Sequence, residues 1–406
     1  MGQDTPLSVD EVTLSRGEDP APVPVVTTRA PVREDQSLYI STGGRLYALN
    51  AADGTARWCQ QVALTREQQF RAQLARLARE HSRVSYPPPP RARFATPRAV
   101  RGAVYVCVEG RGAYTYAFNA DDGSLRWRTP TDGRVASMPL LDYAVPLVNN
   151  GVVYSGTYAL NARDGAVRWR TDVDTSVEGT LSLHALADET IYATTQRGVY
   201  AINVQDRRLR WLYEPDELTI VSGPPVVAGR MLVAGANGSV GYPEKSYFFA
   251  LDVATGADVW RYPNPMGCYI GAATHDRSIY VSSGDRFLYA LDAESGRLRW
   301  RRQFPASALS SAASAGDILY VTIGADGVYA LRSEDGAILW RQPLGNTPGV
   351  RFSFYPPFVL DGAVYVVRSD KRGKCALYAL DAQTGAECWR WQTSPPSAIA
   401  PLAAAQ

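Results

Sequence analysis

A twelve-residue phrase decides the fold: YALDAESGRLRW, which runs from Tyr289 to Trp300. Residues Phe287–Asp292 read as a strand, and Arg297–Trp300 read as the strand that returns beside it. Between them, Gly296 permits the positive φ that closes a short hairpin. The phrase therefore predicts two antiparallel strands joined by a tight turn.

The phrase occurs eight times along the chain. In every copy an aromatic residue and a tryptophan lie 11 residues apart, and eight of the nine tryptophans belong to these copies. Successive repeat tryptophans are separated by 69, 42, 42, 49, 40, 40 and 49 residues. Constant internal spacing predicts a repeat protein whose units stack on their neighbours. The copies run from Tyr47 to Trp58, Tyr116 to Trp127, Tyr158 to Trp169, Tyr200 to Trp211, Phe249 to Trp260, Tyr289 to Trp300, Tyr329 to Trp340 and Tyr378 to Trp389.

Each repeat holds enough chain for four strands. Ile279–Ser282 predicts a strand before the phrase, and small residues such as Ser310–Ala313 predict an innermost strand where side chains have least room. Four-stranded units of about 40 residues, arranged radially, are typical of a β-propeller. We therefore expect an all-β, eight-bladed propeller of four-stranded antiparallel blades over residues 25–406, after an N-terminal extension, 1–24.

The repeat tryptophans are expected to be structural. Large rings at a fixed place in every outer strand can fill the space between neighbouring blades. For the innermost strand of the first blade two segments compete, Val25–Ala30 and Ser397–Leu402. The predicted blade-docking residues are Trp58, Trp127, Trp169, Trp211, Trp260, Trp300, Trp340 and Trp389.

Composition excludes several classes of protein. With 406 residues, of which 46% are hydrophobic, the chain can bury a large core. The formal charge of +2 gives no field that would favour nucleic acid as a partner. No apolar run is long enough to span a membrane, and residues 1–20 lack the hydrophobic segment of a secretion signal, so we expect a soluble monomer. Five scattered cysteines without a CxxC pair argue against a zinc site or a disulfide framework.

The pattern ALDAx[TS]GxxxW resembles the tryptophan-docking repeat of pyrroloquinoline quinone (PQQ) propellers. It is clearest over 250–260, 290–300 and 379–389, and the resemblance extends from about Leu38 to Trp391. Two copies depart from it: Arg207 replaces the turn glycine, and Arg332 replaces the Asn or Asp. These departures leave the turn geometry at those two places open.

This resemblance implies a bacterial protein outside the cytoplasm, in the periplasm or at the cell surface. Such propellers divide into quinoprotein dehydrogenases, which bind PQQ with calcium, and non-enzymatic members. The latter include the lipoprotein of the outer-membrane β-barrel assembly machinery and sensor domains of bacterial kinases. Because the repeat residues serve packing, they report the fold and leave the activity open.

The residues themselves give little support to an enzyme. A PQQ alcohol dehydrogenase is expected to carry adjacent cysteines, and no Cys-Cys dipeptide occurs. The closest carboxylate cluster for calcium is Asp172, Asp174 and Glu178, which we expect to be solvated in a loop. The three histidines, His81, His184 and His275, lack the spacing of metal ligands, and His275 is expected in an exposed turn. We therefore assign no catalytic residue and no metal ligand, and expect no cofactor, with PQQ and Ca2+ as the alternative.

Extra segments fall on one face of the predicted ring. Loops between the second and third strands of a blade open on the same face as the connections between blades, and insertions of repeat proteins tend to mark a binding face. The first insertion predicts a helix from Thr65 to about His81, followed by polyproline at Pro87–Pro90. The extra segments are Leu64–Arg93, Asn237–Ser246, Gly345–Phe354 and Lys371–Lys374.

These observations favour a non-enzymatic binding or scaffold propeller that recognises a protein or a small ligand on the loop-elaborated face. Two alternatives stay open: a PQQ- and calcium-dependent dehydrogenase of alcohols or sugars, and a ligand-sensing domain of a bacterial signalling protein. Aromatic and polar groups at the channel mouth are the candidate ligand-binding residues, and each can instead fill the channel. They are Tyr86, His184, Tyr269, Arg351 and Tyr355.

Overall fold

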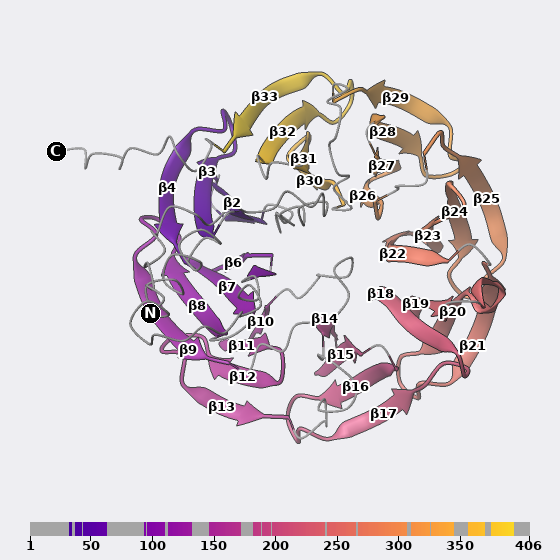
Figure 1. The fold of residues 1–406 in the computed structure, drawn as a ribbon, viewed down its shortest axis with the longest axis horizontal. Helices are drawn as coiled ribbons and strands as arrows, with labels where there is room; N and C mark the ends of the chain where they lie inside the picture. The colour runs from indigo at the N-terminus through magenta and orange to yellow at the C-terminus, as the bar shows by residue number, and fades with distance from the viewer. Residues whose placement is uncertain are drawn as a thin grey trace, which may run out of the picture.

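Eight antiparallel sheets form a closed ring in the computed structural model (Figure 1). Seven sheets have four strands, and the second has five because two short strands pair with β7. The eight-bladed, all-β prediction is confirmed. The described residues are 32–34, 37–42, 44–62, 93–94, 96–109, 113–131, 146–171, 182–187, 189–195, 197–239, 242–264, 267–306, 310–324, 326–344, 356–369 and 375–393.

Every blade is built from consecutive strands, ordered from the axis outward. Blades 1–4 contain β1 (Val32–Glu34), β2 (Ser37–Thr42), β3 (Arg45–Asn50), β4 (Ala56–Gln61); β5 (Arg93–Phe94), β6 (Arg98–Val100), β7 (Ala103–Glu109), β8 (Tyr114–Asn119), β9 (Leu125–Pro130); β10 (Leu147–Asn149), β11 (Val152–Ser155), β12 (Tyr158–Asn161), β13 (Val167–Arg170); and β14 (Ser182–Ala187), β15 (Thr190–Thr194), β16 (Val199–Asn203), β17 (Leu209–Tyr213).

Blades 5–8 repeat this plan, with one short 3-10 helix, η1 (Pro243–Lys245), in blade 5. They contain β18 (Thr219–Ala228), β19 (Met231–Gly238), β20 (Tyr247–Asp252), β21 (Asp258–Pro263); β22 (Cys268–His275), β23 (Ser278–Ser283), β24 (Phe287–Asp292), β25 (Leu298–Gln303); β26 (Ala313–Ala315), β27 (Ile318–Ile323), β28 (Gly327–Arg332), β29 (Ile338–Gln342); and β30 (Phe358–Leu360), β31 (Ala363–Ser369), β32 (Cys375–Asp381), β33 (Glu387–Gln392).

The turn inside the phrase explains its residue types. In blade 6 the amide of Gly296 donates to the carbonyl of Asp292 at 2.9 Å, and Gly296 has a φ of 66°. The Asp292 carboxylate accepts a hydrogen bond from the Ser295 hydroxyl at 2.8 Å. An acidic or amide residue therefore caps the turn, and glycine closes it at positive φ. The departures Arg207 and Arg332 keep the same turn, since the backbone bonds Arg207 N to Asn203 O and Gly336 N to Arg332 O are both present.

Blades are joined by a recurring pair of hydrogen bonds. Between blades 6 and 7, the Trp300 indole N–H and the Tyr280 hydroxyl both donate to the carbonyl of Ser333, at 2.9 and 3.1 Å. Seven repeat tryptophans donate in this way to the next blade. The pairs are Trp58 with Ala120, Trp127 with Ala162, Trp211 with Val253, Trp260 with Ala293, Trp300 with Ser333, Trp340 with Ala382 and Trp389 with Ala51.

The same tryptophan rings lie directly on the turn glycines of the following blade. A Cβ atom added to any of these seven glycines would come within 2.5–2.8 Å of the ring, closer than real Cβ contacts. Glycine is therefore required at the turn for two reasons: the backbone has a positive φ, and the tryptophan ring leaves no space for a Cβ atom. The glycines are Gly54, Gly123, Gly165, Gly256, Gly296, Gly336 and Gly385.

The joint between blades 3 and 4 lacks this arrangement. There Arg207, with a φ of 66°, stands where the other blades have glycine. Among the described residues, neither Trp169 nor Tyr154 donates a hydrogen bond to Val204, the equivalent acceptor. The two aromatic rings still contact each other, with centroids 6.0 Å apart. Among the described residues, this joint is therefore packed through an apolar cluster without the tryptophan hydrogen bond.

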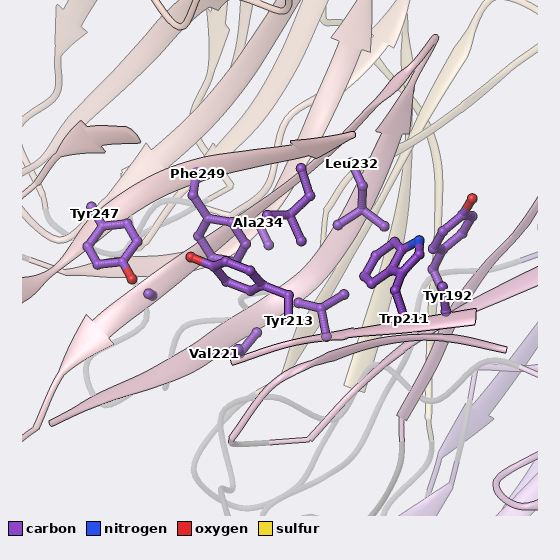
Figure 2. Packing of buried hydrophobic residues seen from close by; sticks show 12 residues of the cluster. Tyr192, Trp211, Tyr213, Val221, Leu232, Ala234, Tyr247 and Phe249 are labelled. Carbon is purple, nitrogen blue, oxygen red and sulfur yellow. The ribbon is translucent and has the colours of Figure 1, made fainter. Parts of the chain in front are cut away.

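The core lies between the blades and not inside them. Figure 2 shows the cluster at the joint of blades 4 and 5, where Tyr192, Trp211 and Tyr213 of blade 4 face Leu232 and Phe249 of blade 5. Seven further clusters of this kind occupy the other joints. Burying large aromatic side chains in this way supplies most of the force that closes the ring.

The first blade corrects one expectation from the sequence. Its innermost strand is β1, so that place is filled by neither Val25–Ala30 nor Ser397–Leu402. Both of those segments lie outside the described residues, as does the expected helix from Thr65 to His81. A strand of three residues carries too little alternation to be recognised in the sequence. Blade 8 closes onto blade 1 through Trp389, whose indole N–H donates to Ala51 O at 3.0 Å.

Candidate functional site: the loop face of blade 5

The insertion between β19 and β20 is a described part of the loop-elaborated face. Its backbone is tied down at both ends: the amide of Gly238 donates to the Ser246 hydroxyl at 3.0 Å, and that of Ser239 donates to the carbonyl of Leu218 at 2.6 Å. A Cβ atom on Gly238 would lie 1.8 Å from the carbonyl oxygen of Tyr242, so only glycine fits there. The described ends of the insertion are thus hydrogen-bonded to neighbouring parts of blade 5.

Two side chains with apolar surface lie side by side at this anchored backbone: Tyr242 in the insertion, and Leu218 in the connection that precedes β18. Leu218 is 46% exposed and Tyr242 is 43% exposed. The Lys245 ammonium lies 5.7 Å from the centroid of the Tyr242 ring, a cation–π contact. We call Leu218, Tyr242 and Lys245 the blade 5 patch. Leu218 itself has a φ of 66°, which is unusual for a branched side chain.

A polar network supports the patch from the joint of blades 4 and 5. The Arg261 guanidinium donates to Asp216 and to Asp258, at 2.5 Å in each case, and stacks over the Tyr247 ring at 4.8 Å. It also donates to the Tyr213 hydroxyl at 3.3 Å. Burial, followed by the hydrogen bond with Tyr247, raises the pKa of Tyr213, so its phenol stays protonated at neutral pH. These contacts fix the segment that carries Leu218 onto blade 5.

His184 is the one sequence-predicted ligand residue whose side chain is described. It occupies a bulge in β14, the innermost strand of blade 4, and its Nε2 lies 2.7 Å from the Thr194 hydroxyl. Its Nδ1 is buried, and within the described ranges no partner lies within hydrogen-bonding distance of it. Burial lowers the pKa of His184 to about 3, so the imidazole is neutral at physiological pH.

The other predicted ligand residues are not brought together with His184 in the described structure. Tyr269 lies on β22, and its side chain is outside the description. Tyr86, Arg351 and Tyr355 fall outside the described residues altogether. The sequence predicted the Asn237–Ser246 insertion on the binding face, without Tyr242 or Leu218 as site residues. Their only sequence signal was their position in or beside an insertion.

His275 differs from the exposed turn residue that the sequence predicted. Its side chain is 22% exposed, and Nε2 lies 3.2 Å from Asp317 Oδ1 of the next blade. It borders a groove of about 510 Å³ between blades 6 and 7, which Arg299 and Arg332 also line. Both guanidiniums are already paired, with Asp292 at 2.7 Å and Asp335 at 2.9 Å. The charges of these two arginines are therefore already compensated within the groove.

The described residues do not provide a metal site. In the ranges that the structure covers, no three His, Cys, Asp or Glu side chains gather in a way that could hold an ion. Asp172, Asp174 and Glu178, the closest cluster in the sequence, lie outside those ranges. Of the described cysteines, Cys59 and Cys388 form no disulfide, and the Cys107 sulfur lies 3.0 Å from the Ser155 hydroxyl. Nor is any helix of the described chain long and apolar enough to cross a bilayer.

The ring of eight blades and its tryptophan joints define a β-propeller of the PQQ-like repeat class. Within that class, the chain belongs to the family of the outer membrane protein assembly factor BamB, which it matches over residues 72–245, 244–312 and 309–405. No curated protein matches the sequence.

Solved structures share the fold at low sequence identity. BamB from Moraxella catarrhalis is 15% identical, with a TM-score of 0.57 over 87% of this chain and 97% of that one. The computationally designed Ika8 protein is 10% identical, with a TM-score of 0.61 over 87% and 96%. Quinohemoprotein alcohol dehydrogenase from Comamonas testosteroni is 16% identical, with a TM-score of 0.58 over 89% and 73%. The fold is therefore common to a BamB and to an enzyme, and does not choose between them.

Proposed function

We propose that this protein is a non-enzymatic scaffold that binds a protein partner on its loop-elaborated face, with the blade 5 patch at the contact. The observation that carries the proposal is the exposure of Tyr242, in the insertion that is anchored to the sheet, and of Leu218, whose carbonyl accepts a hydrogen bond from Ser239 of that insertion. Exposed aromatic and aliphatic side chains on a rigid support are typical of the energetic centre of an interface. Membership of the BamB family supports a protein as the partner.

The repeat chemistry fits this function. The tyrosine hydroxyls and tryptophan N–H groups of the repeat are used in joining blades, as in Tyr280 and Trp300. Recognition is thereby left to residues that depart from the repeat, and the blade 5 insertion is such a departure.

The test begins with a photo-crosslinking amino acid in place of Tyr242 in the source organism. We expect one discrete crosslinked protein, which is then purified for calorimetric titration against the full chain. Tyr242→Ala and Leu218→Asp are each expected to weaken binding by about tenfold or more, because substitutions at the energetic centre of an interface have effects of this size. Leu298→Asp, at an exposed leucine on the outer strand of blade 6, is the matched control and is expected to bind normally. Equal affinities for all four proteins would overturn the proposal.

The second candidate is a quinoprotein that binds PQQ on the propeller axis, and the free Nδ1 of His184 on an innermost strand is the observation that favours it. Among the described residues, no cluster of three His, Cys, Asp or Glu side chains lies beside His184 that could hold calcium. Calorimetric titration with PQQ in calcium, together with a dye-linked oxidation assay on alcohols and aldose sugars, decides the matter. Stoichiometric binding of PQQ with turnover would show that the protein is an enzyme and that the scaffold proposal is wrong.

A further inference from the structure

The outermost strand of blade 4 breaks a pattern that six other blades keep. In those blades the residue after the repeat tryptophan is an arginine, whose guanidinium lies over an aromatic ring of the neighbouring strand. Blade 4 has Leu212 instead, which is 41% exposed and pairs with Tyr200. The stacked pairs of the six blades are Arg128 with Tyr114, Arg170 with Tyr158, Arg261 with Tyr247, Arg301 with Phe287, Arg341 with Tyr329 and Arg390 with Tyr378.

The start of β17 and the turn before it also carry positive charge without ion pairs among the described residues. Arg207, Arg208 and Arg210 are exposed, and none has a carboxylate within ion-pair distance in the described part of the chain. Asp206 uses Oδ1 to accept the backbone amide of Arg208 at 3.0 Å. By contrast, the blade 6 arginines Arg277 and Arg299 pair with Glu294 and Asp292 at 2.7 Å each. The turn end of β17 is therefore a basic surface.

Apolar side chains lie among these arginines. Leu209, at the start of β17, is 45% exposed, so exposed leucines flank Arg210 and Trp211 along the strand. Burying two leucines on association would be favourable by about 1–2 kcal/mol each. A surface that combines cationic and apolar residues is complementary to a segment that combines anionic and apolar ones.

The backbone of β17 offers a place for such a segment. The strand is the last of its sheet, ordered β14-β15-β16-β17, so its outer edge pairs with no other strand (Figure 1). Native sheets protect such edges with charged side chains, and an edge strand that exposes leucine is a template for another strand. Extended peptides bind sheet edges in this way, with the backbone providing affinity and alternate side chains providing specificity.

We propose that the outer edge of β17 binds an extended acidic segment of a protein partner by strand addition. Apolar residues of the segment cover Leu209 and Leu212, and its Asp or Glu residues lie over Arg207, Arg208 and Arg210. This surface is on the rim of blade 4, apart from the blade 5 patch, so it adds a second contact and does not depend on the first. An anionic membrane surface is the competing occupant, because it too would attract arginines beside leucines.

The probe is a fluorescein-labelled octapeptide that alternates valine with aspartate or glutamate, titrated against the full chain in low salt. We expect saturable binding that weakens as salt screens the arginines. The double variant Arg208→Glu with Leu209→Ser is expected to weaken binding about tenfold or more. The matched control makes the same changes at the same repeat positions of blade 6, Arg297→Glu with Leu298→Ser, and is expected to bind like the unmodified protein.

Hydrogen exchange locates the contact. Peptide binding is expected to slow exchange of β17 amides and to leave those of β25 unchanged. The proposal is overturned if the peptide does not bind, if both double variants lose affinity equally, or if β17 amides are not protected. It is also overturned if vesicles containing anionic phospholipid bind the chain with the same dependence on Arg208 and Leu209 while the peptide does not.

Discussion

The joint between blades 6 and 7 and the joint between blades 3 and 4 contain the same two aromatic residues and behave differently. Tyr280 and Trp300 both donate to a carbonyl of the next blade, whereas Tyr154 and Trp169 do not. The difference lies in the partner blade, where Gly336 in one joint corresponds to Arg207 in the other. The aromatic residues are therefore not sufficient to form the joint, and the turn residue of the neighbour decides whether they hydrogen-bond.

The physical reason is space above the turn. A Cβ atom at Gly336 would come within 2.8 Å of the Trp300 ring, so the ring can sit on the turn only when that residue is glycine. Arg207 keeps the turn at a φ of 66° and adds a side chain there. Sequence departures inside one blade thus alter the contact with its neighbour.

The largest expected effect comes from removing the ring itself. Trp300→Ala deletes a partly buried indole and its hydrogen bond, and is expected to lower the free energy of unfolding by about 3 kcal/mol. Trp169→Ala is expected to cost about 1 kcal/mol less, because that indole has no hydrogen bond to lose. Urea unfolding followed by circular dichroism measures both. Equal losses would show that the two joints are energetically alike.

The second largest effect is expected when the joint of blades 6 and 7 receives the turn residue found in blade 4. Gly336→Arg is expected to destabilise by about 2 kcal/mol, because the side chain displaces Trp300 and strains a positive φ. Gly316→Arg is the matched control: its φ is 55°, and nothing lies within 4 Å of an added Cβ. We expect Gly316→Arg to lose only the stability that corresponds to backbone strain. A loss of stability as large as that of Gly336→Arg would contradict the steric explanation.

Acid is expected to weaken blade 4 through His184. Its folded pKa of about 3 lies below the unfolded value of about 6.5, so the unfolded chain binds the extra proton between these values. Stability is therefore complete above pH 7 and falls as the pH decreases, by about 2 kcal/mol at pH 5. His184→Gln should remove most of the difference between pH 7.5 and pH 5, while His275→Gln should retain it. An unchanged pH dependence in His184→Gln would refute this assignment.

The smallest expected effect is an increase in stability. Arg207→Gly is expected to stabilise the chain by about 1 kcal/mol, since it relieves a positive φ and lets Trp169 reach the carbonyl of Val204. Arg101→Gly relieves a similar φ of 51° away from any repeat tryptophan and separates the two contributions. Thermal unfolding of the single variants gives the comparison, and a gain no greater than that of Arg101→Gly would mean that the joint is not restored.

Much of the fold was predictable because the joint imposes its own spacing. A tryptophan that must lie on a glycine turn and bond to a carbonyl cannot move along the sequence, so the constant 11-residue interval specifies eight equivalent blades. The innermost strand β1 was not predictable, because three residues carry no period. Of the blade 5 patch, only the insertion with Tyr242 and Lys245 could be located from the sequence, since the exposure of Tyr242 and of the neighbouring Leu218 depends on how the backbone is tied to the sheet.

Because blade 1 is made from four consecutive strands, as blade 8 is, no strand is exchanged across the seam between them. The first and last blades meet through the same Trp389 and Gly54 contact that joins interior blades. The ring therefore has no privileged starting blade. A circularly permuted gene that begins with blade 4 and fuses blade 8 to blade 1 through a short linker should encode the same ring.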